Sequence, residues 1–242
     1  MSQTKPCILL TFDDQHVDNW HAVLPMLEKY DAKVTFYQNN LDKLTDEQID
    51  KAQQIKAAGH TIGCHGWRHV WPVQYTEDNG IEKFWLDEVQ PCLDWYDAHG
   101  WQITNYAYAF NNYDQHTNAR LFNRFDRFRC GNAVTDRTQF ETFESIFLDL
   151  DQLPTQRMMP GAHLDTISRS EPKPVIPMDV WKRIFTQLTD RAQHMTFYGH
   201  NISATDNQGH VTEVSYLEEV LKLAQEMKIA CVGMDDLPAV VR

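Results

Sequence analysis

Two adjacent carboxylates, Asp13 and Asp14, end the run "LLTFDD" near the start of the chain. Like charges placed side by side where an apolar strand leaves a core need a physical reason. One interpretation is a helix cap, in which Asp14 accepts hydrogen bonds from the free N–H groups of a helix that starts near Gln15. The other is a division of labour, in which one carboxylate binds a metal ion and its neighbour takes a proton from water.

A histidine pair follows a second apolar run: "GCHGWRHV" places His65 and His69 four residues apart. Imidazoles at this spacing lie on one face of a helix and can bind one metal ion. Two histidines and one carboxylate leave coordination positions open, which is typical of catalytic rather than structural metal sites. With 11 histidines in the chain, a pair in the core or on the surface is the alternative.

A further histidine, His200, ends the apolar run of "MTFYGHNIS". A hydrolase of amides or esters must protonate its leaving group, and histidine is the usual donor. The alternative is a buried histidine that bonds to the backbone. We expect His163 and Asp165, in "PGAHLD", to have a packing or loop role, and His16 and His21 to be structural residues of the first helix.

Strand-like and helix-like segments alternate along the chain. The alternation predicts a parallel sheet covered by helices, in which functional residues gather at the carboxyl ends of the strands. The region 153–177, with five prolines, is predicted to be an elaborated loop. The predicted strands are 7–12, 32–40, 60–66, 103–110, 127–132, 195–202 and 229–234, and the predicted helices are 19–31, 45–59, 77–99, 116–125, 177–194 and 213–228.

Composition narrows the class of protein. The 242 residues suit one domain, 1–242, and 42% hydrophobic residues are enough for a sizeable core. The net charge of -12 and the lack of a basic stripe argue against a nucleic-acid binder and against an anionic membrane surface. Five cysteines without a CxxC motif are expected to be reduced and mostly buried. No secretory leader is recognised, so we expect a cytoplasmic protein unless a signal peptide has been removed.

Taken together, "TFDD", "HGWRH", the late "YGH" and the closing "GMDDL" resemble the polysaccharide deacetylase family, also called the NodB-homology deacetylases, from Leu9 to Leu237. The resemblance implies an α/β fold, a distorted (β/α) barrel with about seven repeats. It also implies one divalent metal ion, most often Zn²⁺, with Co²⁺, Ni²⁺ and Mn²⁺ as alternatives. Carried over by position, Asp13 is the general base and His200 the general acid, and the metal ligands are Asp14, His65 and His69.

The activity that the resemblance implies is removal of acetyl groups from an N-acetylated, or O-acetylated, carbohydrate by a metal-activated water. The expected partner is therefore an acetylated sugar or oligosaccharide, with no nucleic acid and no membrane. Two alternatives stay open: a metal-dependent hydrolase of a small amide or cyclic ureide, and a carbohydrate-binding relative without turnover. The motifs leave open the metal, the sugar and its linkage, and the oligomeric state.

The chain departs from the family pattern at three places. Gln15 stands where the family often has glycine, and Gly66 stands where the metal-binding motif usually has a hydroxyl residue. The third motif appears as "YAYAFNNYD" without the arginine that normally pairs with the catalytic aspartate, and Arg129 in "RFRCGN" is the candidate substitute. The candidates for substrate binding are Trp67, Tyr108, Asn111 and Arg129, and the further aromatic residues that could stack on sugars are Trp71, Trp85, Trp95 and Tyr113.

Overall fold

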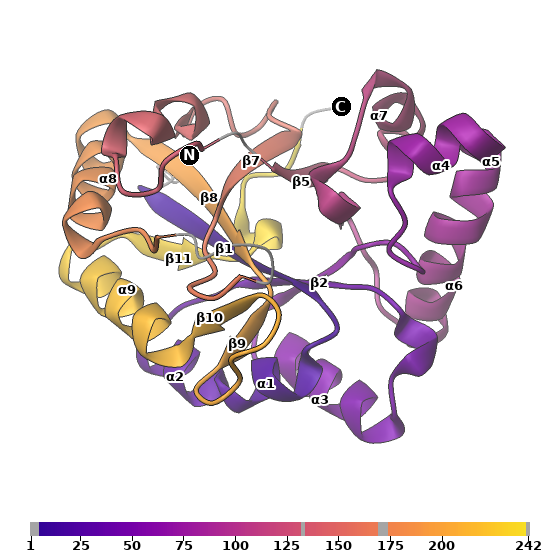
Figure 1. Ribbon diagram of the computed structural model, residues 1–242, viewed down its shortest axis with the longest axis horizontal. Helices are drawn as coiled ribbons and strands as arrows, with labels where there is room; N and C mark the ends of the chain where they lie inside the picture. Colours follow the sequence, from indigo (N-terminus) through magenta and orange to yellow (C-terminus); the bar gives the residue numbers. More distant parts are fainter. Residues whose placement is uncertain (1–4, 132–133, 169–173, 241–242) are drawn as a thin grey trace.

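Seven parallel strands close into a barrel in the computed structural model, which describes residues 5–131, 134–168 and 174–240 (Figure 1). The strands follow one another around the barrel in chain order, and β1 closes the ring by pairing with β8 along Cys7–Phe12. This confirms the predicted barrel of about seven repeats. The barrel strands are β1 (Cys7–Asp14), β2 (Thr35–Gln38), β3 (Thr61–Cys64), β4 (Asn105–Ala107), β5 (Arg127–Gly131), β7 (Met158–His163) and β8 (Gln193–Gly199).

Within the described residues, four short strands lie outside the ring. β11 (Ala230–Val232) runs parallel to the first residues of β1, and β6 (Leu148–Asp149) pairs antiparallel with the start of β8. β9 (Asn201–Ser203) and β10 (Val211–Glu213) form a separate pair directly after the end of β8. The chain therefore continues from a barrel strand into a small sheet beside the carboxyl ends of the strands (Figure 1).

The prediction of a loop over 153–177 is wrong where β7 crosses it, and residues 169–173 of that region lie outside the described part. β7 has the sequence "MMPGAH" and pairs with β5 and β8 in the ring. Proline lacks an N–H group and glycine lacks a side chain to pack, so neither favours a strand. Because of Pro160 and Gly161, the sequence of β7 does not predict a strand, and its pairing with the strands on both sides makes it one.

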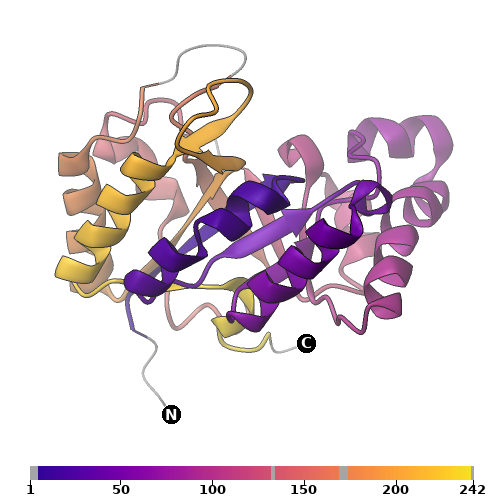
Figure 2. The same cartoon turned by 90° about the horizontal axis from the view of Figure 1, so that it is seen from below.

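The helices surround the barrel, and Figure 2 shows α9, the pair α1–α2 and α3 along one side of it. Their bounds are α1 (Val17–Ala22), α2 (Leu24–Lys29), α3 (Asp46–Ala57), α4 (Pro72–Asn79), α5 (Ile81–Phe84), α6 (Gln90–Ala98), α7 (Gln115–Leu121), α8 (Met178–Arg191) and α9 (Val214–Glu226). A π-helical turn spans Trp85–Val89, and 3₁₀ turns span Leu41–Lys43, Ala109–Asn111, Phe140–Ile146 and Met234–Asp236.

Two predicted helices are interrupted. The segment 19–31 forms two short helices that meet at Val23, because Pro25 starts a new helix more readily than it continues one. The segment 77–99 begins earlier, at Pro72, and breaks at Gly80, whose φ of 86° a helix cannot accommodate. The helix-cap interpretation of Asp14 is also wrong, since the residue before α1 is His16 and no side chain caps that helix.

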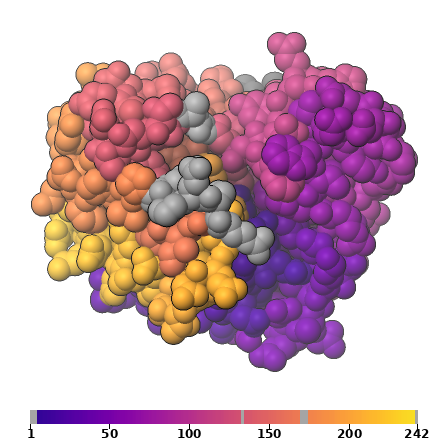
Figure 3. Space-filling model, viewed as in Figure 1, coloured from indigo at the N-terminus to yellow at the C-terminus, as the bar shows by residue number. Residues whose placement is uncertain are grey.

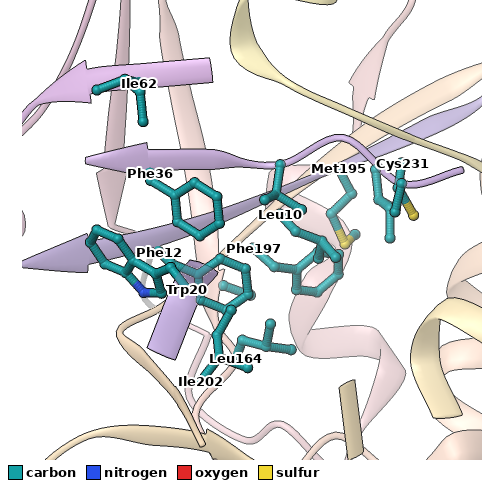
Figure 4. Packing of buried hydrophobic residues seen from close by; sticks show 14 of the residues in the cluster. Leu10, Phe12, Trp20, Phe36, Ile62, Leu164, Met195, Phe197, Ile202 and Cys231 are labelled. Atoms are coloured by element: carbon teal, nitrogen blue, oxygen red, sulfur yellow. The ribbon is translucent and has the colours of Figure 1, made fainter. Parts of the chain in front are cut away.

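β1 separates two apolar layers because its side chains alternate between faces. Ile8, Leu10 and Phe12 belong to the large core between barrel and helices, in part shown in Figure 4. Cys7 and Leu9 belong to a smaller cluster on the other face, toward the barrel interior. By the same alternation Asp13 points to the interior, and the chain there must supply a partner for its charge.

Trp20 anchors the first helix on the barrel. Its buried ring lies 4.9 Å from that of Phe36 (Figure 4), and its Nε1 donates a hydrogen bond of 2.9 Å to the carbonyl oxygen of His200. One side chain therefore joins the core to the residue that follows β8.

The cysteines test one sequence-based expectation about the chain. All five cysteines are buried and free of disulfide bonds, as predicted. Among the helices of the described ranges, none has both the length and the apolar character that crossing a bilayer requires.

Replacing Trp20 by alanine is expected to lower the free energy of unfolding by about 3–5 kcal/mol, because a fully buried aromatic side chain leaves a cavity. Urea denaturation followed by circular dichroism measures the change. Trp71→Ala is the matched control: that ring is 53% exposed, and its loss should cost about 1 kcal/mol or less. Equal losses in the two variants would contradict the packing described.

Candidate active site

A cavity of about 740 Å³ opens at the carboxyl ends of the barrel strands. Its lining residues come from distant parts of the chain, from Asp13 to His210. On this face of the molecule, the purple and magenta segments lie to the right and the orange and yellow segments, later in the sequence, lie to the left (Figure 3). The five residues predicted for catalysis and metal binding all line the cavity: Asp13, Asp14, His65, His69 and His200.

Asp14, His65 and His69 point one atom each at a common centre. The two Nε2 atoms are 3.1 Å apart, and Oδ1 of Asp14 lies 3.4 Å from His69 Nε2 and 3.9 Å from His65 Nε2. Ligand atoms held about 2.0–2.2 Å from a tetrahedral zinc ion are separated by roughly 3.3–3.6 Å. The three residues therefore fit the donor types and the spacing of a divalent metal site with an open side.

Neighbouring groups fix the orientation of two of these residues, His65 and Asp14. Nδ1 of His65 donates to the carbonyl oxygen of Ala107 at 2.8 Å, which leaves a lone pair on Nε2 toward the common centre. Asn39, at the end of β2, donates to Asp14 Oδ1 at 2.9 Å. Burial, first of all, and the neighbouring His69 hold the pKa of His65 well below its usual range, so its imidazole is neutral. Neutral imidazole is the form that binds metals.

The segment that carries the histidine pair is a loop, so the expectation of a shared helical face is wrong. Gly66 and His69 have φ values of 85° and 60°, in the left-handed region that non-glycine residues seldom adopt. Asp14 is similar, with a φ of 83°. Such backbone is typical of functional sites, where surrounding contacts hold it in place.

Glu88 holds this loop from below. The side chain is buried, and its carboxylate accepts a hydrogen bond from the backbone N–H of Arg68 at 2.9 and 3.1 Å. The backbone N–H groups of His69 and Val70 also hydrogen-bond to this carboxylate. A Cβ atom on Gly66 would lie 3.1 Å from Glu88 Oε2. The departure at Gly66 thus has a physical reason: a buried carboxylate from the π-helical turn occupies the space beside it and secures the loop.

Asp13 meets its counter-charge inside the barrel. Arg129, on β5, is fully buried and donates from one terminal nitrogen to Asp13 Oδ2 and from the other to the side-chain oxygen of Asn111. The sequence candidate for the missing arginine therefore reaches the predicted base from β5, the neighbour of the strand β4 that carries the third motif. Oδ1 of Asp13 is buried and has no hydrogen-bond partner among the described residues.

On the opposite wall, His200 pairs with Asp165. Nδ1 of His200 donates to Asp165 Oδ2 at 2.6 Å, and Oδ1 accepts the backbone N–H of His200 and the hydroxyl of Thr212. Burial disfavours the charged imidazole, but the hydrogen bond and the charge of Asp165 outweigh it and raise the pKa of His200 to about 9. His163 and Asp165, for which a packing or loop role was expected, both belong to this wall.

Not all of the predicted substrate-binding residues line the cavity. Tyr108, Asn111 and Arg129 line the cavity, whereas Trp67 does not and packs half-buried against the core. Among the other aromatic candidates Trp71 lines the cavity, Trp85 is buried, Trp95 stacks on His99, and Tyr113 stacks on Tyr108.

Phe110 is a cavity residue that sequence reasoning missed. It is a non-glycine residue with a φ of 55°, and its ring lies 4.4 Å from that of His69 and stacks at 4.2 Å on Trp71. Glu88 and His210 are further residues of the site that sequence reasoning missed; no motif marks them, since they enter from separate elements.

Replacing Arg129 by methionine is expected to lower the free energy of unfolding by about 3–5 kcal/mol, because Asp13 would keep a buried charge without a partner. The double variant Asp13→Leu/Arg129→Met removes both charges and should recover most of that loss. Denaturation of wild type, single and double variants measures both effects. A double variant no more stable than Arg129→Met would contradict the pairing.

Comparison by sequence identifies residues 1–94 with the family model described as Polysaccharide deacetylase. A Bacillus subtilis (strain 168) protein, YxkH, named provisionally as a polysaccharide deacetylase, is 35% identical over 93 residues, 36% of this chain and 33% of its own. The chitin disaccharide deacetylase of Vibrio alginolyticus is 32% identical over 97 residues, 38% of this chain and 21% of its own. The matches thus span a third or less of these relatives' length.

Comparison by structure covers nearly the whole chain. The peptidoglycan deacetylase PdaC from Bacillus subtilis superposes with a TM-score of 0.59 at 14% identity, over 98% of this chain and 92% of that one. A CE4 family pseudoenzyme from Bacillus anthracis gives 0.58 at 13% identity, over 97% and 66%. The first 94 residues of the chain are therefore similar to the polysaccharide deacetylase family, and nearly the whole chain has the fold of these solved structures.

Proposed function

We propose that this protein is a metal-dependent hydrolase that removes acetyl groups from an N-acetylated or O-acetylated carbohydrate. The observation that carries the proposal is the convergence, in one cavity, of a three-residue metal site, a carboxylate held by arginine and a histidine held by aspartate. The family description and the names of the relatives, chitin disaccharide deacetylase and peptidoglycan deacetylase, support the choice of an acetylated sugar.

Asp14, His65 and His69 would hold the metal ion, which when bound polarises the acetyl carbonyl and lowers the pKa of a water molecule. Asp13 is suited to take the proton from that water. One of its oxygens, Oδ2, accepts from Arg129 and lies 3.8 Å from His65 Nε2 at the edge of the metal site, and the other, Oδ1, is free of hydrogen bonds within the described structure. Arg129 and Asn111 keep the carboxylate in a single orientation, as a base needs.

His200 is suited to protonate the departing amine or alcohol. Its Nδ1 hydrogen is committed to Asp165, so Nε2 is the atom left to donate into the cavity. The charge of Asp165 keeps the imidazole protonated at neutral pH, which an acid requires. With base, acid and metal ligands all present, the cavity favours an enzyme over a binding protein without turnover.

The rim of the cavity favours a sugar over a small amide. Trp71 and Phe110 form an exposed aromatic stack beside His69, with Tyr108 and Asn111 further in. Aromatic faces bind the apolar faces of pyranose rings, and polar groups below them can orient an acetamide.

Asp13→Asn is expected to reduce acetate release from a chitin disaccharide by roughly 10²–10⁴-fold, since it removes the base but none of the metal ligands. Zinc bound per chain, measured by mass spectrometry after dialysis, should stay at the wild-type level. Asp14→Asn is the control and should lower both activity and zinc content. An Asp13→Asn protein that is folded and fully active would overturn the role of Asp13.

The activity is expected to fall on the alkaline side with a midpoint near pH 9, because the acid form of His200 is lost as pH rises through its pKa. Asp165→Asn removes the charge that raises this pKa, so the alkaline limb should move down by about one pH unit or more. Rates of acetate release measured from pH 6 to 10 give the alkaline limb of the wild type and that of Asp165→Asn. An unchanged limb in Asp165→Asn would show that His200 is not the acid.

A further inference from the structure

A second group of metal-type ligands lies on the wall opposite Asp14, His65 and His69. It consists of His163 at the end of β7, Asp165 after it, His200 after β8 and His210 before β10. One ligand atom from each residue lies within 4.8 Å of the others, and the group shares no residue with the first. Three imidazoles and one carboxylate are donors that zinc prefers.

The carboxylate of this group is already oriented. Asp165 is fully buried, and its Oδ1 is fixed by the backbone N–H of His200 and the hydroxyl of Thr212. Its Oδ2 is therefore turned toward the histidines, at 2.6 Å from His200 Nδ1 and 3.0 Å from His163 Nε2. Outer contacts that aim a carboxylate in this way are characteristic of metal ligands.

His163 and His210 are not needed for His200 to act as a general acid. Asp165 and His200 are sufficient to hold and donate a proton, yet His163 contacts the same oxygen and the ring of His210 lies 4.9 Å from that of His200. Nδ1 of His163 is also buried without a hydrogen-bond partner in the described part of the chain. A buried ring nitrogen without a partner is costly unless a ligand or a proton engages it.

We propose that His163, Asp165, His200 and His210 bind a second divalent cation, of which zinc is the best match. Binding takes the place of the hydrogen that His200 Nδ1 shares with Asp165, and that proton passes to solvent. Since the ion occupies the pair that serves as acid in the proposed function, on which this consequence rests, filling the second site inhibits the enzyme.

The binding test uses four proteins: the wild-type chain and the variants His65→Ala/His69→Ala, His163→Asn/His210→Asn, and all four substitutions together. Equilibrium dialysis against excess zinc should give about two, one, one and no bound ions per chain. One ion in wild type that persists in His163→Asn/His210→Asn would overturn the second site. Thermal unfolding of each protein shows whether it is folded, and Co²⁺ absorption spectra report each site separately.

The same set separates the two proposals. If the first site fails, His65→Ala/His69→Ala binds as much zinc as wild type, whereas failure of the second site shows in His163→Asn/His210→Asn. Wild-type acetate release should rise up to one equivalent of zinc and then fall at least tenfold in excess zinc. In His163→Asn/His210→Asn the ratio between these two rates should approach one. An equal fall in both proteins would place the inhibition elsewhere.

Discussion

The pairing of β1 with β8 is the contact on which the site depends. These two strands lie side by side from Cys7–His194 to Phe12–Gly199, and their pairing ends at the carboxyl edge of the barrel. The residues that come next are Asp13 and Asp14 on one side and His200 on the other, although they are almost 190 positions apart in sequence. A parallel barrel closed at this seam brings the proposed base, metal ligand and acid together before any loop is considered.

Closure of the barrel also places carboxylates in and near its interior, where each needs a partner for its charge. Strand alternation turns Asp13 into the barrel and leaves Asp14 at the rim, so two neighbouring carboxylates face different surroundings. The interior supplies Arg129 to Asp13, and the rim supplies Asn39 and two histidines to Asp14. On the opposite wall, the buried carboxylate of Asp165 is paired with imidazoles instead of an arginine. Adjacent like charges are tolerable here because each has its own partner.

The barrel and its five central residues were predictable, since strand ends in a βα alternation must meet and the motifs lie at those ends. Arg129 could also be proposed, because residues two apart on a strand share a face and "RFR" sends both arginines inward. β7 could not, since Pro160 and Gly161 carry no strand signal and only the neighbouring strands impose it. Glu88 and His210 act through loops and a π-helical turn, whose geometry depends on tertiary packing rather than on local pattern.

The proposed metal centre is tested most directly by acetate release from a chitin disaccharide by metal-stripped protein, measured before and after one equivalent of zinc, for wild type and for His69→Ala. We expect no release without metal, turnover after zinc in wild type, and little turnover in His69→Ala. Equal turnover with and without zinc, or turnover in His69→Ala equal to that of wild type, would contradict a metal centre at Asp14, His65 and His69.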